Sequence, residues 1–224
     1  MNVLGLQRAL GVRADGDYGP VTRAATDTAL TCPDPRPLVE ADFLAAAARL
    51  RCPAPAVKAV VAVESGRLGG FDKNTRRPII LFEPHVFSRE TGGDFDASHP
   101  LISYAGWGKR PYPRTQAERW TQLHQAMALD PGAALSSASW GAFQVMGFNH
   151  RACGFGTAWA FARAMASGSR AQLDAAANYI LHRRLDDELR EGRWAAFALA
   201  WNGPGFAKHD YDGRLAAENR RAAA

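Results

Sequence analysis

Residues 60–71 read V-V-A-V-E-S-G-R-L-G-G-F, and this stretch places a carboxylate at the end of an apolar helical face. Val57, Val60, Val61 and Glu64 stand at i, i+3, i+4 and i+7, so Glu64 shares the stripe that should face a core. Burial and the negative C-terminal end of a helix both disfavour an ionised carboxylate. We therefore expect a raised pKa at Glu64, as a general acid requires; a helix-end glutamate in a surface or structural ion pair is the alternative.

The composition is that of an ordinary globular protein, since 47% of the 224 residues are hydrophobic and 22% are charged. The formal net charge of +5 comes from arginines scattered along the chain. It indicates an anionic partner, such as nucleic acid, a phospholipid surface or a bacterial wall polymer, without choosing among them. No apolar stretch approaches the roughly 18 residues needed to span a bilayer. Arg8 interrupts the first apolar run, so we expect no signal peptide and cytosolic synthesis.

Neither a disulfide framework nor a metal site is expected. Cys32, Cys52 and Cys153 are too few and too unevenly spaced, although a bridge between Cys32 and Cys52 stays open for an oxidising compartment. The histidines form no H-E-x-x-H, and residues 94–99 lack the downstream glutamate of a calcium loop. A peptidase that uses Cys153 with His150 lacks an orienting residue. We expect no cofactor and no metal.

Three parts follow one another along the chain: a helical unit over 1–31, a Pro-rich linker over 32–37 and an α-dominated domain over 38–224. In the first, D-G-D-Y-G-P-V-T-R predicts a turn between two helices. Gly16 and Gly19 suit positive φ there, and Pro20 suits the first turn of the second helix.

The second domain is predicted to be mainly helical with one small β element. Thr115 and Glu118 have the spacing of a capping box at the start of a helix. Only residues 77–82 read as a strand, and Gly/Pro-rich loops are expected at 66–76 and 91–114. Helices are expected at 38–51, 55–65, 115–129, 157–167, 169–191 and 193–201, with a short one near the end.

Three motifs resemble the lysozyme-like superfamily. Glu64-Ser65, Ser139–Gln144 and Ala200–Gly205 look like its E-S, G-L-M-Q and A-Y-N-A-G signatures, in the order found in goose-type lysozymes and lytic transglycosylases. The resemblance implies a lysozyme-like α+β catalytic domain.

A closer resemblance is to the phage and prophage N-acetylmuramidase family, which has E-S-x-G-x-G-F, R-P-I-I-L-F-E-x-H-x-F and S-W-G-x-F-Q-x-M-G-x-N as typical motifs. Here they stand at Glu64–Phe71, Arg77–Phe87 and Ser139–Asn149, within a resemblance over about residues 38–206. It implies an endolysin that cleaves the β-1,4 bond between N-acetylmuramic acid and N-acetylglucosamine in peptidoglycan. It also implies export by a separate membrane lesion such as a phage holin.

The N-terminal unit is similar to a peptidoglycan-binding domain, through V-x-x-L-Q-x-x-L-G-V-x-A-D-G-x-Y-G-P-x-T-x-x-A. It is about half the usual length, so its core is small. Two interpretations are open: it binds glycan, or it only packs on the catalytic domain.

For the chemistry, Glu64 is expected to protonate the glycosidic oxygen. Glu83, directly after the predicted strand, is the first choice for a second carboxylate, with a structural ion pair to an arginine as the alternative. Asp72, Asp94 and Asp96 are further candidates in loops.

Substrate contacts are expected from neutral hydrogen-bonding groups and flat aromatic faces. The candidates are Ser139, Gln144, Asn149, Asn202, Tyr104, Trp107, Tyr112 and Trp201. The expected partner is the peptidoglycan glycan strand, met by a monomer without nucleic acid or stable membrane insertion. Two rival functions stay open: a lytic transglycosylase, which forms 1,6-anhydro ends with a single acid, and a non-catalytic wall-binding protein.

Overall fold

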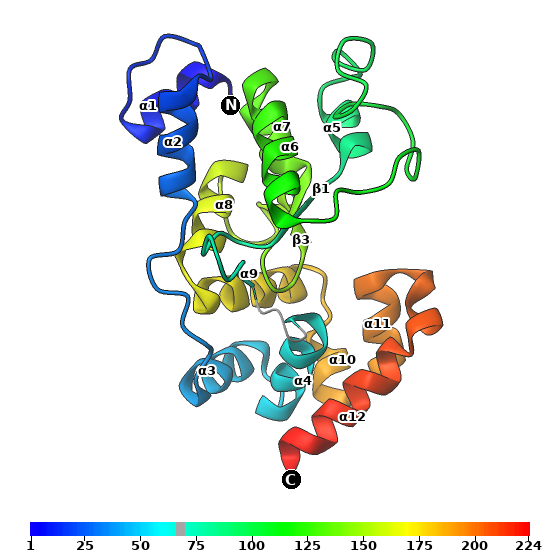
Figure 1. The fold of residues 1–224 in the computed structure, drawn as a ribbon. Helices are drawn as coiled ribbons and strands as arrows, with labels where there is room; N and C mark the ends of the chain where they lie inside the picture. The colour runs from blue at the N-terminus through cyan, green and yellow to red at the C-terminus, as the bar shows by residue number, and fades with distance from the viewer. Residues whose placement is uncertain (66–69) are drawn as a thin grey trace.

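Helices dominate the computed structural model, which describes residues 1–65 and 70–224 (Figure 1). This confirms the mainly α fold with a small β element. The helices are α1 (Val3–Leu10), α2 (Pro20–Ala29), α3 (Glu40–Leu50), α4 (Ala54–Ser65), α5 (Pro84–Glu90), α6 (Gln116–Leu129), α7 (Pro131–Ser136), α8 (Ala158–Ser167), α9 (Ser169–His182), α10 (Asp186–Glu191), α11 (Trp194–Asn202) and α12 (Tyr211–Ala223), with 3₁₀ turns η1 (Gly147–Asn149) and η2 (Pro204–His209).

The sheet has three antiparallel strands in the order β1-β2-β3: Ile80–Phe82, Ala138–Trp140 and Val145–Met146. The strand expected at 77–82 is β1, which pairs Leu81 with Ser139. The β2–β3 hairpin was not expected, because its strands are only three and two residues long. Gly141 lies in the turn between these strands and has a φ of 69°. A Cβ at this position would collide with the side chain of Gln172.

Most expected helices are present, with three differences. The helix expected over 169–191 is broken in two, because Arg184 adopts a left-handed φ of 55° between α9 and α10. The helix near the C-terminus is longer than expected, since α12 has 13 residues. Helices α5 and α7 were not expected; each begins with a proline, Pro84 or Pro131, that suits the first turn. Thr115 and Glu118 form the expected capping box.

The N-terminal unit is built by the residues of its own motif. Gln7 is buried and donates through Nε2 to Oδ1 of Asp15 (2.7 Å) and to Oγ1 of Thr22 (3.0 Å), while its Oε1 accepts from the amide of Gly16 (2.9 Å). Gly16 has the expected positive φ of 85°, but the expectation for Gly19 was wrong: it caps α2 in extended backbone at φ −79°. These motif residues thus hold the turn between α1 and α2.

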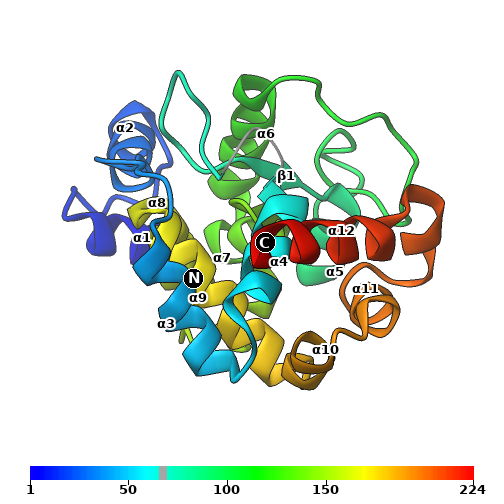
Figure 2. The same ribbon diagram turned by 90° about the horizontal axis from the view of Figure 1, so that it is seen from below.

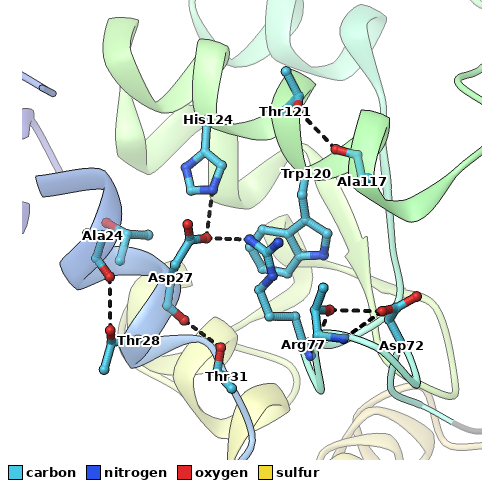
Figure 3. A network of polar contacts seen from close by, with 12 residues as sticks. Ala24, Asp27, Thr28, Thr31, Asp72, Arg77, Ala117, Trp120, Thr121 and His124 are labelled. Carbon is cyan, nitrogen blue, oxygen red and sulfur yellow. Dashed lines mark hydrogen bonds and ion pairs between the residues drawn. The ribbon is translucent and has the colours of Figure 1, made fainter. Parts of the chain in front are cut away.

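A polar network joins this unit to the rest of the chain (Figure 3). Asp27 of α2 accepts hydrogen bonds from Arg77 and from Nε2 of His124 (2.9 Å). Tyr18 donates its hydroxyl hydrogen to Nδ1 of His124 (2.7 Å), and burial raises the pKa of Tyr18 to about 12. The guanidinium of Arg77 lies 4.6 Å from the ring centroid of Trp120. The unit is therefore docked by charged and aromatic contacts.

The hydrophobic core is continuous across the expected linker. Leu6 and Leu30 are fully buried in the same cluster as Trp120 and Trp140. Cys32, Cys52 and Cys153 are free thiols. Within residues 1–65 and 70–224, no helix is long and apolar enough to cross a membrane.

Candidate active site

Glu64 lies in the last turn of α4, beneath α12. The face of α4 that carries Val57, Val60 and Val63 is buried in the core, and Glu64 is half-buried beside it. Helix α12 packs against α4, and Figure 2 shows it in red crossing the cyan helix. The carboxylate is thus shielded by an element from the far end of the chain.

Tyr211, the first residue of α12, donates its hydroxyl hydrogen to Oε1 of Glu64. Burial raises the pKa of the Glu64 carboxyl, while Tyr211, Trp201 and the positive charge of Arg214 lower it by lesser amounts, and the pKa stays above its ordinary value. The expected direction is confirmed. Tyr211 is buried, at 7% exposure, so the bond lies away from bulk solvent.

The A-W-N-G-P-G-F segment explains why α12 returns to α4. Helix α11 ends at Asn202 because Gly203 takes a φ of 76°, and Pro204 then starts η2. Asp210, in the left-handed region at φ 48°, ends η2 and precedes α12. This turn brings Tyr211 to the acid, and Tyr211 was not among the residues expected from the sequence.

A cavity of about 470 Å³ opens beside Glu64. Its volume is within the range typical of small-molecule sites. It is lined by Val63, Glu64, Asn202, Gly205, Phe206, Lys208, His209, Tyr211 and Arg214. Asn202 of the W-N-G motif thus lines the same cavity as Glu64. Trp201 of that motif contacts Glu64 through a side-chain hydrogen bond that lowers the pKa of the carboxyl. The three basic side chains and Phe206 were not expected, and no local pattern distinguishes them from surface residues.

Glu83 lies between β1 and α5, with its side chain 15% exposed. Its Oε2 accepts a hydrogen bond from the hydroxyl of Tyr112 (2.7 Å) and lies 3.3 Å from Nδ1 of His85. Among the described residues, Glu83 forms no ion pair with an arginine. Its partners are Tyr112 and His85.

Three of the expected aromatic residues lie in the loop next to Glu83, and one of them, Tyr112, contacts its carboxylate directly. Burial raises the pKa of Tyr112, and so does the carboxylate of Glu83. Burial also raises the pKa of Tyr104; Arg110 lowers it by less, and Glu83 adds a smaller rise. Trp107 is 75% exposed and contacts the hydroxyl of Tyr112. Tyr104, Tyr112 and Arg110 line a cavity of about 250 Å³. The loop over 91–114 therefore presents aromatic faces next to Glu83.

Ser139, Gln144 and Asn149 lie elsewhere, in and after the β2–β3 hairpin. Ser139 donates to Oε1 of Gln144 (2.9 Å), and Gln144 donates to the carbonyl oxygens of Gly141 (2.7 Å) and Ile79 (3.2 Å). Asn149 ends η1, where its carbonyl accepts from the amide of Cys153 (3.0 Å). The side chains of Ser139 and Gln144 hold the hairpin, and no hydrogen bond of the described residues joins them to Glu64.

Residues 53–223 match the model of the N-acetylmuramidase family. The chain belongs to this family. The crystal structure of a Burkholderia AP3 phage endolysin is similar, with a TM-score of 0.77 and 32% sequence identity, over 99% of this chain and 94% of that chain. No curated protein sequence matches. This muramidase is accordingly a peptidoglycan hydrolase, a glycosidase of the lysozyme type.

Two of the remaining acidic candidates of the muramidase, Asp72 and Asp96, accept hydrogen bonds from nearby residues of the chain. Burial alone would raise the pKa of Asp72, but hydrogen bonds from Thr75 and Asn74 hold it below its ordinary value. Asp96 accepts from Ser88 (2.9 Å) and Ser103 (2.6 Å). Asp94 is exposed in the same loop. Of the E-S-G-R-L-G-G-F motif, residues 66–69 lie outside the described part of the chain.

A peptidase site at Cys153 is not supported. The thiol is fully buried, and burial raises its pKa to about 12, so it stays protonated. Nδ1 of His150 lies 2.8 Å from the carbonyl oxygen of Phe155 instead.

A larger cavity, of about 660 Å³, lies between the linker and α9 of the muramidase. Its charged side chains are already paired: Arg170 contacts Asp42 (2.9 Å) and Asp174 (3.0 Å), and Arg36 contacts Asp34 (3.0 Å). The smaller cavity at Glu64 is therefore the better candidate for catalysis, since it alone of the two contains a carboxyl with a raised pKa.

Proposed function

We propose that the enzyme cleaves the β-1,4 bond between N-acetylmuramic acid and N-acetylglucosamine, with Glu64 as general acid. One observation carries the proposal: a half-buried carboxyl of raised pKa borders a cavity beside Asn202 and Trp201. A carboxyl that keeps its proton near neutral pH can protonate the leaving oxygen as the sugar gains oxocarbenium character.

Tyr211 is proposed as the residue that positions this acid. Because its hydroxyl donates to Oε1 of Glu64, the acidic proton is proposed to lie on Oε2. After proton transfer, the same hydroxyl stabilises the new carboxylate. Tyr211 acts through Glu64 and does not need to touch the substrate.

Glu83 is proposed as the second carboxylate, which activates water or forms the glycosyl-enzyme bond. The support is its location at the end of β1, next to an exposed aromatic loop, with Tyr112 and His85 fixing Oε2. Tyr104, Trp107 and Trp201 are proposed to stack against sugar rings. Ser139, Gln144, Asn149 and Asn202 remain proposed as polar contacts, of which Asn202 has the best support because it lines the cavity.

The decisive experiment is Glu64→Gln. The amide is nearly isosteric and cannot act as an acid, so turnover of purified peptidoglycan should fall by about 10² to 10⁴-fold. The melting temperature should not fall. Glu90→Gln, an exposed position on α5, is the matched control and should keep full activity. Activity of Glu64→Gln near that of the control would refute the assignment.

The products separate hydrolysis from the rival reaction. Mass spectrometry of digested peptidoglycan should find reducing-end muramic acid. Products that end in 1,6-anhydro-muramic acid would instead identify a lytic transglycosylase.

For the organisation of the chain, we propose that the unit over 1–31 works while docked on the catalytic domain over 38–224, with residues 32–37 as linker. The support is the contact of Asp27 with Arg77 and His124. We further propose a monomer that takes glycan strands, not nucleic acid, and that reaches the wall through a holin-type lesion. Removal of residues 1–37 tests the docking: it should destabilise the catalytic domain, whereas an independent binding module would leave its melting temperature unchanged.

A further inference from the structure

Basic side chains border the cavity at Glu64. Lys208 and His209 come from η2, and Arg214 comes from the first turn of α12. All three are exposed. Among the residues that the structure describes, neither Lys208 nor Arg214 takes part in an ion pair. Positive charge in this cavity is therefore available to a ligand.

Arg214 lies close enough to Glu64 for its positive charge to lower the pKa of the carboxyl. Its Nη2 donates to the carbonyl oxygen of Val63 (3.4 Å), the residue before Glu64. Its positive charge favours the ionised form of Glu64 and so lowers the pKa that burial raises. A cation beside a general acid reduces the fraction of enzyme that holds the proton. The charge becomes useful once an anionic group of the substrate lies next to it and offsets this effect.

Peptidoglycan offers such a group, whereas a neutral glycan does not. Muramic acid carries a lactyl ether that ends in a carboxylate or continues into a stem peptide with carboxylates of its own. Glycan strands made only of N-acetylglucosamine have no negative charge. The cavity of about 470 Å³ beside Glu64 is within the size range of small-molecule sites and has room for a substituent of the sugar.

We infer that Lys208 and Arg214 form a carboxylate-binding subsite beside Glu64, which recognises the acidic substituent of muramic acid. The inference rests on the proposed role of Glu64 and adds the chemistry by which the cavity distinguishes peptidoglycan from uncharged glycans. Phe206, half-buried on the same wall, provides an apolar surface for the methyl groups of that substituent. Lysine and arginine both bind carboxylates by charge-assisted hydrogen bonds.

The test removes a positive charge from the enzyme and, separately, the negative charge from the substrate, and compares the effects. Lys208→Gln is the primary variant, because Arg214 also acts on Glu64 and its loss changes two properties at once. Lys73→Gln, an exposed lysine of the 72–77 turn outside the cavity lining, is the matched control. Three soluble glycan oligomers are compared: one with free lactyl carboxylates, one with a dipeptide stem that has free carboxylates, and one with that dipeptide fully amidated.

Lys208→Gln should lower kcat/KM by about 5- to 20-fold on the dipeptide oligomer with free carboxylates, and by less than twofold on the amidated oligomer. A loss on the dipeptide oligomer alone assigns the subsite to the stem-peptide carboxylates, and a loss on the free lactyl oligomer alone assigns it to the lactyl carboxylate. Comparable losses on both show that the subsite accepts either carboxylate. Equal losses on charged and amidated oligomers, or no loss on either, would overturn the inference. The Lys73→Gln control should show no difference.

Glu64→Gln, measured on the same three oligomers, separates this inference from the proposed function. It should be inactive on all of them. If Glu64→Gln keeps its activity, the general-acid assignment fails, whatever Lys208→Gln shows. If Glu64→Gln is inactive while Lys208→Gln is indifferent to substrate charge, only the subsite fails.

Discussion

The hydroxyl of Tyr211 in α12 donates to Oε1 of Glu64 in α4, across 147 positions of sequence. This contact lies at the packed interface of the two helices (Figure 2). It holds one oxygen of the carboxyl in place. Helix α12 thus has a role at the site beyond the burial of the apolar face of α4.

Loss of the Tyr211 hydroxyl should affect both turnover and its pH dependence. For Tyr211→Phe we expect about a tenfold lower kcat, because the acid loses its orientation. The alkaline limb of activity should move to higher pH, since the hydrogen bond lowers the pKa of Glu64 in the native enzyme. Full pH–rate profiles provide the measurement. Tyr179→Phe, which removes a hydroxyl that accepts a hydrogen bond from Arg183, should leave the profile in place.

The raised pKa of Glu64 predicts that this residue destabilises the fold at neutral pH. Because the folded state binds the proton more tightly than the unfolded state, its contribution to stability falls as pH rises above the ordinary pKa of a glutamate. Glu64→Gln should therefore match the native protein near pH 4 and exceed its melting temperature at pH 8. Thermal unfolding across this range is the measurement. A constant difference between the two proteins would contradict the burial argument.

The network at Asp27 predicts an acid-sensitive interface. Burial would raise the pKa of Asp27, but His124 and Arg77 hold it below its ordinary value. A depressed pKa means that Asp27 stabilises the fold above about pH 4, and that this stability is lost as pH falls through the folded pKa. Asp27→Asn should cost about 1–2 kcal/mol at neutral pH. The difference should shrink as the pH falls below about 4 in denaturant titrations, while Asp94→Asn in an exposed loop leaves the stability unchanged.

The role of Glu83 can be separated into chemistry and structure. Glu83→Gln keeps an oxygen that can accept from Tyr112, so the local fold should survive with a melting temperature within about 2 °C. Activity should fall by at least about 100-fold if the carboxylate attacks or activates water. Peptidoglycan turnover and thermal unfolding are measured together. A large loss of melting temperature alongside activity would assign Glu83 a structural role.

Local sequence patterns determined much of this protein. The 3.6-residue spacing placed Glu64 next to the buried face of α4, and the Thr115–Glu118 spacing marked the start of α6. The segment over 77–82 contained β1. These features follow from contacts within a few residues along the chain, so sequence alone predicts them.

Only the tertiary structure decided what surrounds the acid. Tyr211, Lys208 and Arg214 carry no local signal, because their relation to Glu64 arises when the turn after α11 folds α12 back across α4. The same holds for Ser139 and Gln144, whose polar groups are engaged in a hairpin too short to recognise from sequence. Sequence thus selected Glu64 as a candidate, while packing between distant helices determined the direction of its pKa shift and the charge of its cavity.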